Sequence, residues 1–361
     1  MQRYELWNGV SVSSNLISVG IGLGAVYTGY GVVGYVLARV AVSILSNLGY
    51  FLIIPQLLPH FRMNWGVDRA MLRRLREYVG TGVLMRISGL LSSGLDRTLI
   101  GAWVGVAAVG VYAIPLLMVT SLGGVVTGML GFTFPLSSEL VATGQHDKLR
   151  DIYIRSSRFI AGLASIIYIP LLIFGDIFLV LWVGSDTAAK ASGVLHLLVL
   201  ASYLQVFAVI LLNYIVVASG HIRVYTVYVL VRAGVISLGY VLLIPWLGIE
   251  GAGVALLLGN GIEWIFFLFA LRHYLLIDPR TLFRVAYLKP FLLAMIMAGS
   301  AYLLRPFATS WVGLGLVVVG LEILYIGIGF WIGIFGETEK RALVGLWKAV
   351  AGPRQKKVPQ V

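Results

Sequence analysis

Long apolar runs separated by short polar segments make up most of the chain. Each run holds roughly 20 residues, the length that an α-helix needs to cross about 30 Å of hydrocarbon. The alternation of apolar and polar residues that a membrane β-barrel requires does not occur in these runs. The pattern predicts an all-α polytopic membrane protein with about ten transmembrane helices. The predicted spans are 10 to 27, 32 to 54, 78 to 97, 107 to 135, 158 to 182, 191 to 218, 223 to 246, 251 to 271, 288 to 304 and 311 to 335.

The composition agrees with a membrane location. Hydrophobic residues make up 59% of the chain, charged residues only 12%, and the mean hydropathy is +0.94, whereas charged residues are about a quarter of a soluble domain. The 43 glycines would allow helix backbones to approach closely in lipid. Cysteine is absent, which excludes a disulfide framework and a thiolate metal site.

Lysine and arginine concentrate in alternate loops. If the N-terminus is cytoplasmic, 21 of the 27 lie inside, Lys190 and Arg305 lie outside, and 4 lie within spans. Positively charged loops resist translocation, so this distribution predicts that both termini are cytoplasmic. The net charge of +12 then reflects this signal and contact with anionic lipid headgroups. It does not imply nucleic-acid binding.

The longest predicted cytoplasmic loop ends in an amphipathic segment, VDRAMLRRLRE. Met71 and Leu75 share one helical face, while Arg69 and Arg73 point away from it. We therefore expect residues 61–76 to form a linker helix that lies on the inner leaflet.

Motifs of enzymes are missing from the sequence. There is no HExxH, phosphate-binding loop or CxxC, and the glycine cluster GIGLG at 20 to 24 lies inside a predicted span. The predicted outer loops are too short to carry the carboxylates of a membrane-embedded transferase. We predict a protein that is not an enzyme and has no cofactor or metal, which leaves transport, passive conduction and scaffolding.

Two segments of the chain resemble each other. Residues 31–52 align without gaps on residues 248–269, and each segment follows a comparable apolar span. The aligned small residues are Gly31 with Gly248, Gly34 with Gly251, and Ala38 with Ala255. Such repeats are common in secondary transporters. The second copy is preceded by four further predicted spans, within residues 77–220, and the first copy by none.

Five spaced motifs carry a resemblance to a known family. They are LDRTLIGAWVGVAAVGVYAIP from Leu95, FPLSSELVATGQHDKLR from Phe134, LWVG at 181 to 184, VVASGHIRVY at 216 to 225 and IPWLGIEGAGVA at 244 to 255. With these motifs the chain resembles, over nearly its whole length, the polysaccharide (O-antigen or Wzx-like) flippases of the multidrug, oligosaccharidyl-lipid and polysaccharide exporter superfamily.

The resemblance implies a two-lobed, exporter-type helical bundle with an incomplete N-terminal lobe. The first four helices of the family pattern would be lacking, through a truncated start, a remnant, or a protein that works with another chain. The implied parts are the last two helices of the N-terminal lobe (1–60), the linker (61–76), the six-helix C-terminal lobe (77–275), two additional helices (276–335) and a basic cytoplasmic tail (336–361).

The function implied by the resemblance is translocation of a lipid-linked oligosaccharide. A polyprenyl-pyrophosphate carrier would cross the cytoplasmic membrane of a prokaryote for cell-surface polysaccharide synthesis. The partners would be membrane lipids and a polysaccharide polymerase or glycosyltransferase, with no nucleic acid. The alternatives are a cation-coupled multidrug exporter of the same fold and a non-transporting truncated remnant or scaffold.

Two arginines within spans are candidates for substrate binding, because an anionic headgroup needs positive partners at membrane depth. Arg39 in the second span faces a position near Gly20 across its hairpin, and Arg86 in the third faces a position near Thr120. Neither position carries an acid. The alternative is that each arginine bonds to carbonyls or to an acid on a non-adjacent helix.

A further intramembrane arginine has a predicted partner. Arg232 and Glu263 are almost equally far from the turn near Leu247, which places them at the same depth on neighbouring antiparallel helices. We predict an intramembrane ion pair.

Three other charges are candidates for gating or ion coupling. Asp96 and Arg97 lie near the predicted outer end of the third span, where they could equally cap a helix at the interface. Glu322 lies in the middle of the last predicted span and could border a lipid groove.

Overall fold

The computed structural model describes residues 4–57, 69–130, 133–206 and 210–336, and every regular element in these ranges is a helix. The prediction of an all-α protein is therefore confirmed. Eight stretches are long and apolar enough to cross a membrane. The first of them, Ser13–Leu48, runs through two helices. The helix Arg69–Trp103 is not among the eight, because polar and charged residues interrupt its apolar sequence. The orientation of the termini stays a prediction.

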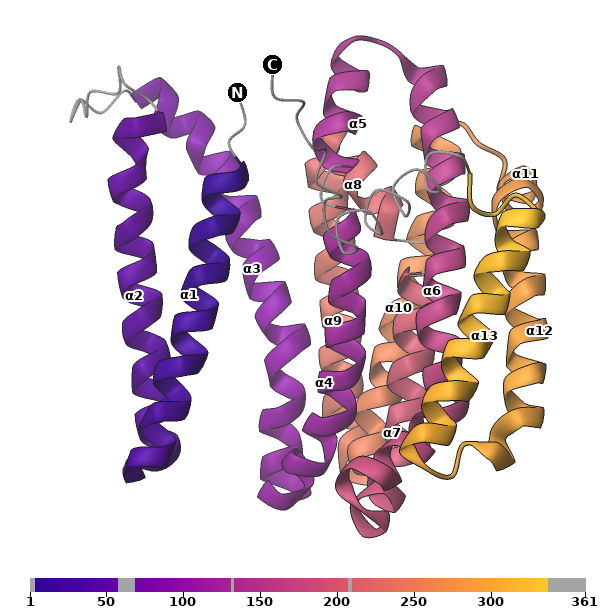
Figure 1. Cartoon of the computed structure of the whole chain (residues 1–361). Coiled ribbons are helices and arrows are strands. Elements are labelled where there is room, and N and C mark those ends of the chain that lie inside the picture. Colours follow the sequence, from indigo (N-terminus) through magenta and orange to yellow (C-terminus); the bar gives the residue numbers. More distant parts are fainter. Residues whose placement is uncertain (1–3, 58–68, 131–132, 207–209, 337–361) are drawn as a thin grey trace, which may run out of the picture. The chain divides into compact units, whose positions relative to one another are not determined.

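The chain divides into two compact units, Met1–Arg73 and Arg74–Val361. The first unit contains a helical hairpin, drawn in indigo in Figure 1. Its elements are α1 (Tyr4–Ala25), the π-helical turn η1 (Val26–Tyr30) and α2 (Gly31–Leu57). Residues 61–68 of the predicted linker lie outside the described residues, and residues 69–76 form the start of the helix Arg69–Trp103. The predicted tail over 336–361 lies outside the described residues except for Gly336.

Glycine makes the turn of this first hairpin possible. Gly29 has φ +91° and Gly31 has φ +58° and ψ −152°, conformations that residues with a Cβ rarely adopt. Beyond the turn, a Cβ on Gly34 would lie 2.4 Å from the Cβ of Tyr30. Farther along the hairpin the hydroxyl of Ser46 donates a hydrogen bond to that of Ser14, with 2.7 Å between the oxygens.

The second unit is a bundle of long helices with short ones at its ends (Figure 1). Its first helix, α3, begins in the preceding unit. The elements are α3 (Arg69–Trp103), α4 (Val106–Met129), α5 (Thr133–Ala142), α6 (His146–Val183), α7 (Ser185–Leu204), α8 (Ile210–Ala218), α9 (Ile222–Leu247), α10 (Ile249–Tyr274), α11 (Pro279–Leu282), η3 (Phe283–Tyr287), α12 (Leu288–Leu304), η4 (Arg305–Phe307) and α13 (Trp311–Trp331).

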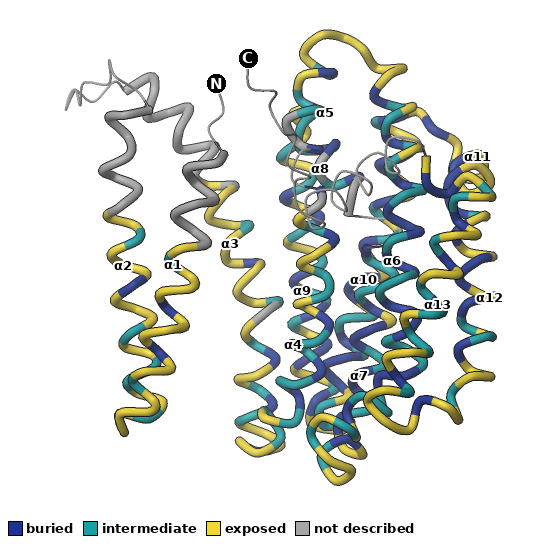
Figure 2. The backbone as a smooth tube through the Cα atoms, viewed as in Figure 1, coloured by how far each residue is buried: buried dark blue, intermediate teal, exposed yellow. Residues whose placement is uncertain are grey.

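Helix α6 links the two apolar cores of this unit. The larger core joins it to α4, α7, α9 and α10, and the smaller joins it to α12 and α13. Figure 2 shows buried residues concentrated along α6, α7 and α10. The predicted additional helix pair thus packs on one side of α6.

One predicted span is wrong in its continuity. The span predicted over 107–135 ends as α4 at Met129, and the separate helix α5 begins at Thr133. Pro135 lies in the first turn of α5, where its missing N–H does no harm, whereas it would break a continuous helix. The span predicted over 191–218 contains α7, which ends at Leu204 and is followed by π-helical residues 205–206, and α8, which begins at Ile210; residues 207–209 lie outside the described residues.

The hairpin of α9 and α10 turns in the same way as the first hairpin. Gly248 has φ +59° and ψ −138°, close to the values of Gly31, the residue with which it aligns. Gly251 follows, and a Cβ there would lie 2.5 Å from the carbonyl oxygen of Leu243. The sequence repeat therefore coincides with a repeat of backbone geometry.

Cationic side chains fasten the α12–α13 pair to the bundle. Arg158 of α6 donates to the carbonyl oxygens of Val285 (3.1 Å) and Gly333 (3.2 Å), and Lys289 donates to that of Ile332 (2.8 Å). Carbonyls at helix ends lack partners within the helix and favour positive charge. At the opposite end of α12, Arg305 forms an ion pair with Asp176 of α6.

Gly251→Ala is expected to destabilise the protein, because the added Cβ would meet backbone atoms of α9, which cannot rotate aside as a side chain can. Overpacking of this kind costs about 1–3 kcal/mol. Thermal unfolding of the purified protein in detergent should show a lower midpoint. Gly261→Ala is the matched control, since this exposed glycine of α10 has nothing within 4 Å of an added Cβ. Equal midpoints for the two variants would contradict the close approach of α9 and α10.

Candidate functional site

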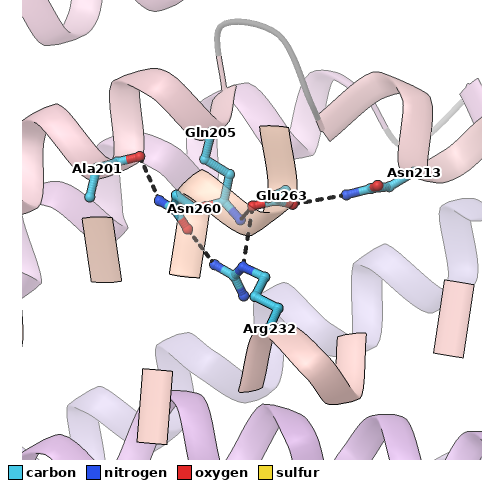
Figure 3. A network of polar contacts seen from close by, with 6 residues as sticks. All are labelled: Ala201, Gln205, Asn213, Arg232, Asn260 and Glu263. Atoms are coloured by element: carbon cyan, nitrogen blue, oxygen red, sulfur yellow. Dashed lines mark hydrogen bonds and ion pairs between the residues drawn. The ribbon is translucent and has the colours of Figure 1, made fainter. Parts of the chain in front are cut away.

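A network of polar side chains lies where α7, α8, α9 and α10 meet (Figure 3). Its centre is Glu263 of α10, of which only 2% of the side chain is exposed. Arg232 of α9 places its Nε 3.2 Å from Oε2 of this carboxylate. The structure thus brings together the two residues predicted to pair, and the arginine side chain is only 19% exposed.

Asn260 of α10 connects Arg232 to α7. Nη2 of Arg232 donates a hydrogen bond to Oδ1 of Asn260 over 2.8 Å. The amide nitrogen of Asn260 donates to the carbonyl oxygen of Ala201 in α7 over 2.7 Å. Because Asn260 accepts from a cation and donates to a carbonyl, its orientation is fixed by both contacts.

The carboxylate of Glu263 receives two more hydrogen bonds from the region where α7 ends and α8 begins. Gln205, directly after α7, donates to Oε2 over 3.1 Å, and Asn213 of α8 donates to Oε1 over 3.2 Å. Tyr228, one turn before Arg232 on α9, is also close enough to interact electrostatically with the carboxylate of Glu263. The end of α7 and the helix α8 therefore each direct an amide at one buried charge.

This arrangement binds four helices through one neutralised pair. A buried carboxylate is tolerated when an opposite charge and hydrogen-bond donors surround it, and Glu263 has both. Sequence reasoning found the ion pair but missed Gln205, Asn213 and Asn260. Only Asn260 had a usable signal, since it lies three residues before Glu263 and so on the same helical face.

Asp96 lies in a second buried polar cluster. It is 2% exposed, and its Oδ2 accepts a hydrogen bond of 2.7 Å from the hydroxyl of Tyr112 in α4. On the same helix, the carbonyl oxygen of Ser92 accepts a bond of 3.2 Å from the hydroxyl of Tyr240 in α9. Since α3 continues to Trp103, Asp96 does not cap a helix end.

The remaining predicted cations are exposed. Arg39 of α2, Arg86 and Arg97 of α3 form no ion pair with any residue in the described ranges. Arg97 therefore does not pair with the adjacent Asp96, whose carboxylate instead accepts the backbone N–H of Arg97. The structure gives Arg39 and Arg86 no partner acid in the part of the chain that it describes.

Glu322 borders an apolar groove of about 660 Å³ between α4, α6 and α13. Aromatic side chains line the groove toward the start of α13, where Phe178 lies 5.6 Å from Trp182 and 5.5 Å from Trp311 between ring centroids. Glu322 is half-buried and is the only charged side chain among the described residues that line the groove. Within the described ranges no group of three or more metal-ligating side chains occurs.

Comparison with known structures identifies the class of fold. The chain is similar to a protein described as "Lipid II flippase MurJ, inward closed conformation", with a TM-score of 0.66 and 12% sequence identity over 89% of this chain and 67% of that one. The helical bundle thus has the fold of that flippase structure.

The family follows from the sequence. The chain belongs to the polysaccharide biosynthesis protein family, whose model matches residues 2–188. The resemblance to polysaccharide exporters is therefore confirmed. No curated protein matches the chain.

Removing one partner of the Arg232–Glu263 pair is expected to destabilise the protein strongly. Glu263→Leu leaves a buried arginine without a counter-charge, which costs about 3–5 kcal/mol. The double variant Arg232→Leu/Glu263→Leu should lose much less than the two single variants together. A double-mutant cycle by chemical unfolding measures the difference.

The control cycle uses Arg155 and Asp151 on α6. Nη2 of Arg155 lies 2.9 Å from Oδ2 of Asp151, and both side chains are mostly exposed. An exposed pair couples by about 0.2–1 kcal/mol. A coupling for the buried pair no larger than this value would refute its structural role.

Proposed function

We propose that this chain is a flippase that moves a lipid-linked oligosaccharide across the cytoplasmic membrane of a prokaryote for the synthesis of a cell-surface polysaccharide. The likeness in fold to a lipid II flippase over 89% of the chain carries the proposal, and membership of the polysaccharide biosynthesis protein family supports it. The carrier is a polyprenyl pyrophosphate. A glycosyltransferase that builds the oligosaccharide and a polymerase that uses it are the partners that this function needs.

The proposed function assigns parts of the chain as in the exporter pattern. Residues 1–60 supply helices of an N-terminal lobe, residues 77–275 form the C-terminal lobe, and residues 276–335 form the additional pair. In this proposal the chain acts by transport and not by bond chemistry, which its likeness in fold to a flippase supports.

Arg39 and Arg86 are the proposed contacts for the pyrophosphate. Both are exposed arginines, Arg39 in the apolar helix α2 and Arg86 in α3, and neither charge is neutralised by an acid among the described residues. A charged side chain at the centre of a membrane costs about 2.5–3.5 kcal/mol on insertion scales. Contact with a phosphate group would offset that cost, and a guanidinium can contact a phosphate with two parallel hydrogen bonds.

Arg39→Ala and Arg86→Ala are each expected to reduce transport about tenfold or more, because a hydrogen bond to a charged group contributes about 1.5–3 kcal/mol. Lysine at either position should retain part of the activity, since it keeps the charge and loses the bidentate geometry. The measurement is the amount of surface polysaccharide in cells that depend on the variant, normalised to the membrane level of the protein.

Arg155→Ala is the control, because Arg155 is an exposed arginine of α6 that pairs with Asp151. Normal polysaccharide export by both alanine variants at normal protein levels would remove Arg39 and Arg86 from the proposed site. Normal export in cells without the protein would instead favour the remnant or scaffold.

A multidrug exporter of the same fold is a second candidate function. The observation that favours it is the groove with Glu322, because an apolar surface with one carboxylate suits a lipophilic cation. In that case Glu322 takes part in substrate binding or ion coupling. Asp96 and Arg97 are the other two residues proposed for gating or ion coupling.

Glu322→Gln separates the two candidates. If the chain is a flippase, polysaccharide export should change less than about threefold, since the substitution keeps the shape of the side chain and removes only a charge that a neutral prenyl chain does not need. If the chain exports lipophilic cations, the variant should lose resistance to them while polysaccharide export stays independent of the protein. Assays of both phenotypes in one strain decide between them.

A further inference from the structure

A second apolar groove runs along the outer face of the α9–α10 hairpin. It has a volume of about 560 Å³ and is open along its length. Its walls are apolar side chains of both helices, among them Val227, Val231 and Ile265, which are 60%, 49% and 66% exposed. From residue 223 to residue 231 the α9 wall extends about 12 Å at 1.5 Å per residue, close to the roughly 15 Å depth of one leaflet.

Basic side chains stand at one end of this groove. Arg223, in the first turn of α9, lines the groove itself. Arg272 and His273, in the last turn of α10, line an adjoining pocket that shares Phe269 with the groove. All three are exposed, and no carboxylate or amide side chain is among the described residues that line either space.

Ring contacts hold the basic end in shape. The ring of His273 stacks on Phe269 with centroids 5.4 Å apart and planes at 13°. It also meets Tyr274 edge to face, with centroids 5.0 Å apart. Tyr274 also lies 4.2 Å from His221, just before α9. The aromatic contacts thus connect the end of α10 to the start of α9, so that the basic groups of both helices stay together.

We propose that this groove is a binding site for an anionic phospholipid, with the phosphate at Arg223, Arg272 and His273 and one acyl chain along the α9–α10 face. The basic residues at one end of the groove match the charge of the phosphate. The apolar wall, about as long as one leaflet is deep, matches the acyl chain. The described lining offers no amide or carboxylate side chain to sugar hydroxyls, so an oligosaccharide-bearing lipid fits less well. The site is separate from the Glu322 groove, which lies on other helices.

The proposal does not require Arg223 to be free of other contacts, since this residue keeps a further interaction within the protein. A guanidinium has five donors, and the phosphate needs only some of them. Each basic residue near an anionic membrane surface contributes attraction in any case. A specific site differs from this general attraction in three ways: binding depends on which basic residues are present, on the charge of the headgroup and on space for the acyl chain. The experiment tests each of the three.

The experiment measures lipid binding to the full-length protein by native mass spectrometry in detergent. Palmitoyl-oleoyl phosphatidylglycerol is added in a titration, and phosphatidylcholine with the same chains serves as the neutral comparison. We expect one phosphatidylglycerol to remain bound under conditions that remove phosphatidylcholine. Arg223→Gln/Arg272→Gln should weaken this binding about thirtyfold, from the attraction of two cations.

Arg280→Gln/Arg284→Gln is the matched control, because both arginines are exposed, lie soon after α10 and line neither space. It should bind as the unchanged protein does. Val227→Trp tests the groove without changing charge, and it should also weaken binding, since the indole would fill the space of the acyl chain.

One further variant guards against loss of folding. Arg272→Gln/His273→Gln leaves Arg223 and its internal interaction in place, and it should still weaken binding. Equal losses in the control variant and the site variants would reduce the effect to general charge attraction and overturn the proposal. Equal retention of phosphatidylcholine, or displacement of phosphatidylglycerol by an equimolar polyprenyl pyrophosphate, would overturn it as well. Because these outcomes concern lipid binding alone, they are independent of polysaccharide export.

Discussion

The hydrocarbon region of a membrane holds no water, so a polar group buried there must find its partners within the protein. Glu263 and Arg232 meet this requirement through each other and through amides contributed by α7, α8 and α10. The contacts need α9 and α10 close together, and glycines such as Gly251 and Gly259 permit that distance because any larger residue would meet the facing helix. Gln205, directly after α7, and Asn213 of α8 serve the same requirement, since both direct an amide at one carboxylate. Close packing, two amide donors and a buried charge are therefore aspects of one arrangement.

The two aligned hairpins satisfy this requirement with different chemistry. Gly31 and Gly248 share a backbone conformation that favours glycine, so the turns are equivalent. The gapless alignment pairs Ser46 with Glu263, and Ser46 bonds across its hairpin to Ser14. Two hydroxyls can satisfy each other across two helices, whereas a carboxylate and a guanidinium need further donors and acceptors around them. The α9–α10 hairpin accordingly lies among α7 and α8, which supply those groups. One backbone design thus carries a neutral contact in one copy and a charged network in the other.

The helices were largely predictable from the sequence, and their mutual contacts were not. Arg232 and Glu263 could be paired because both belong to one hairpin, where equal distance from a turn fixes equal depth. Gln205 and Asn213 come from other helices, and the apolar pattern does not say which helices face each other. For Asp96 the boundary of α3 was placed too early, and a residue expected at an interface is buried against Tyr112.

The arginines within the helices divide into two physical classes. Arg232 is paired with Glu263 and mostly buried. Its charge therefore stabilises the contacts between helices and is not available to a substrate. Arg39 and Arg86 are exposed and have no ion pair with any described residue. Placing a charge in a membrane helix costs a few kcal/mol, and a paired arginine recovers that cost from its partner. An arginine without a partner acid must recover it elsewhere, and a phosphate group, whether on a carrier lipid or a membrane lipid, has the complementary charge and geometry. For this reason the absence of a partner acid, and not the depth of the residue alone, makes Arg39 and Arg86 the stronger candidates for binding an anionic headgroup.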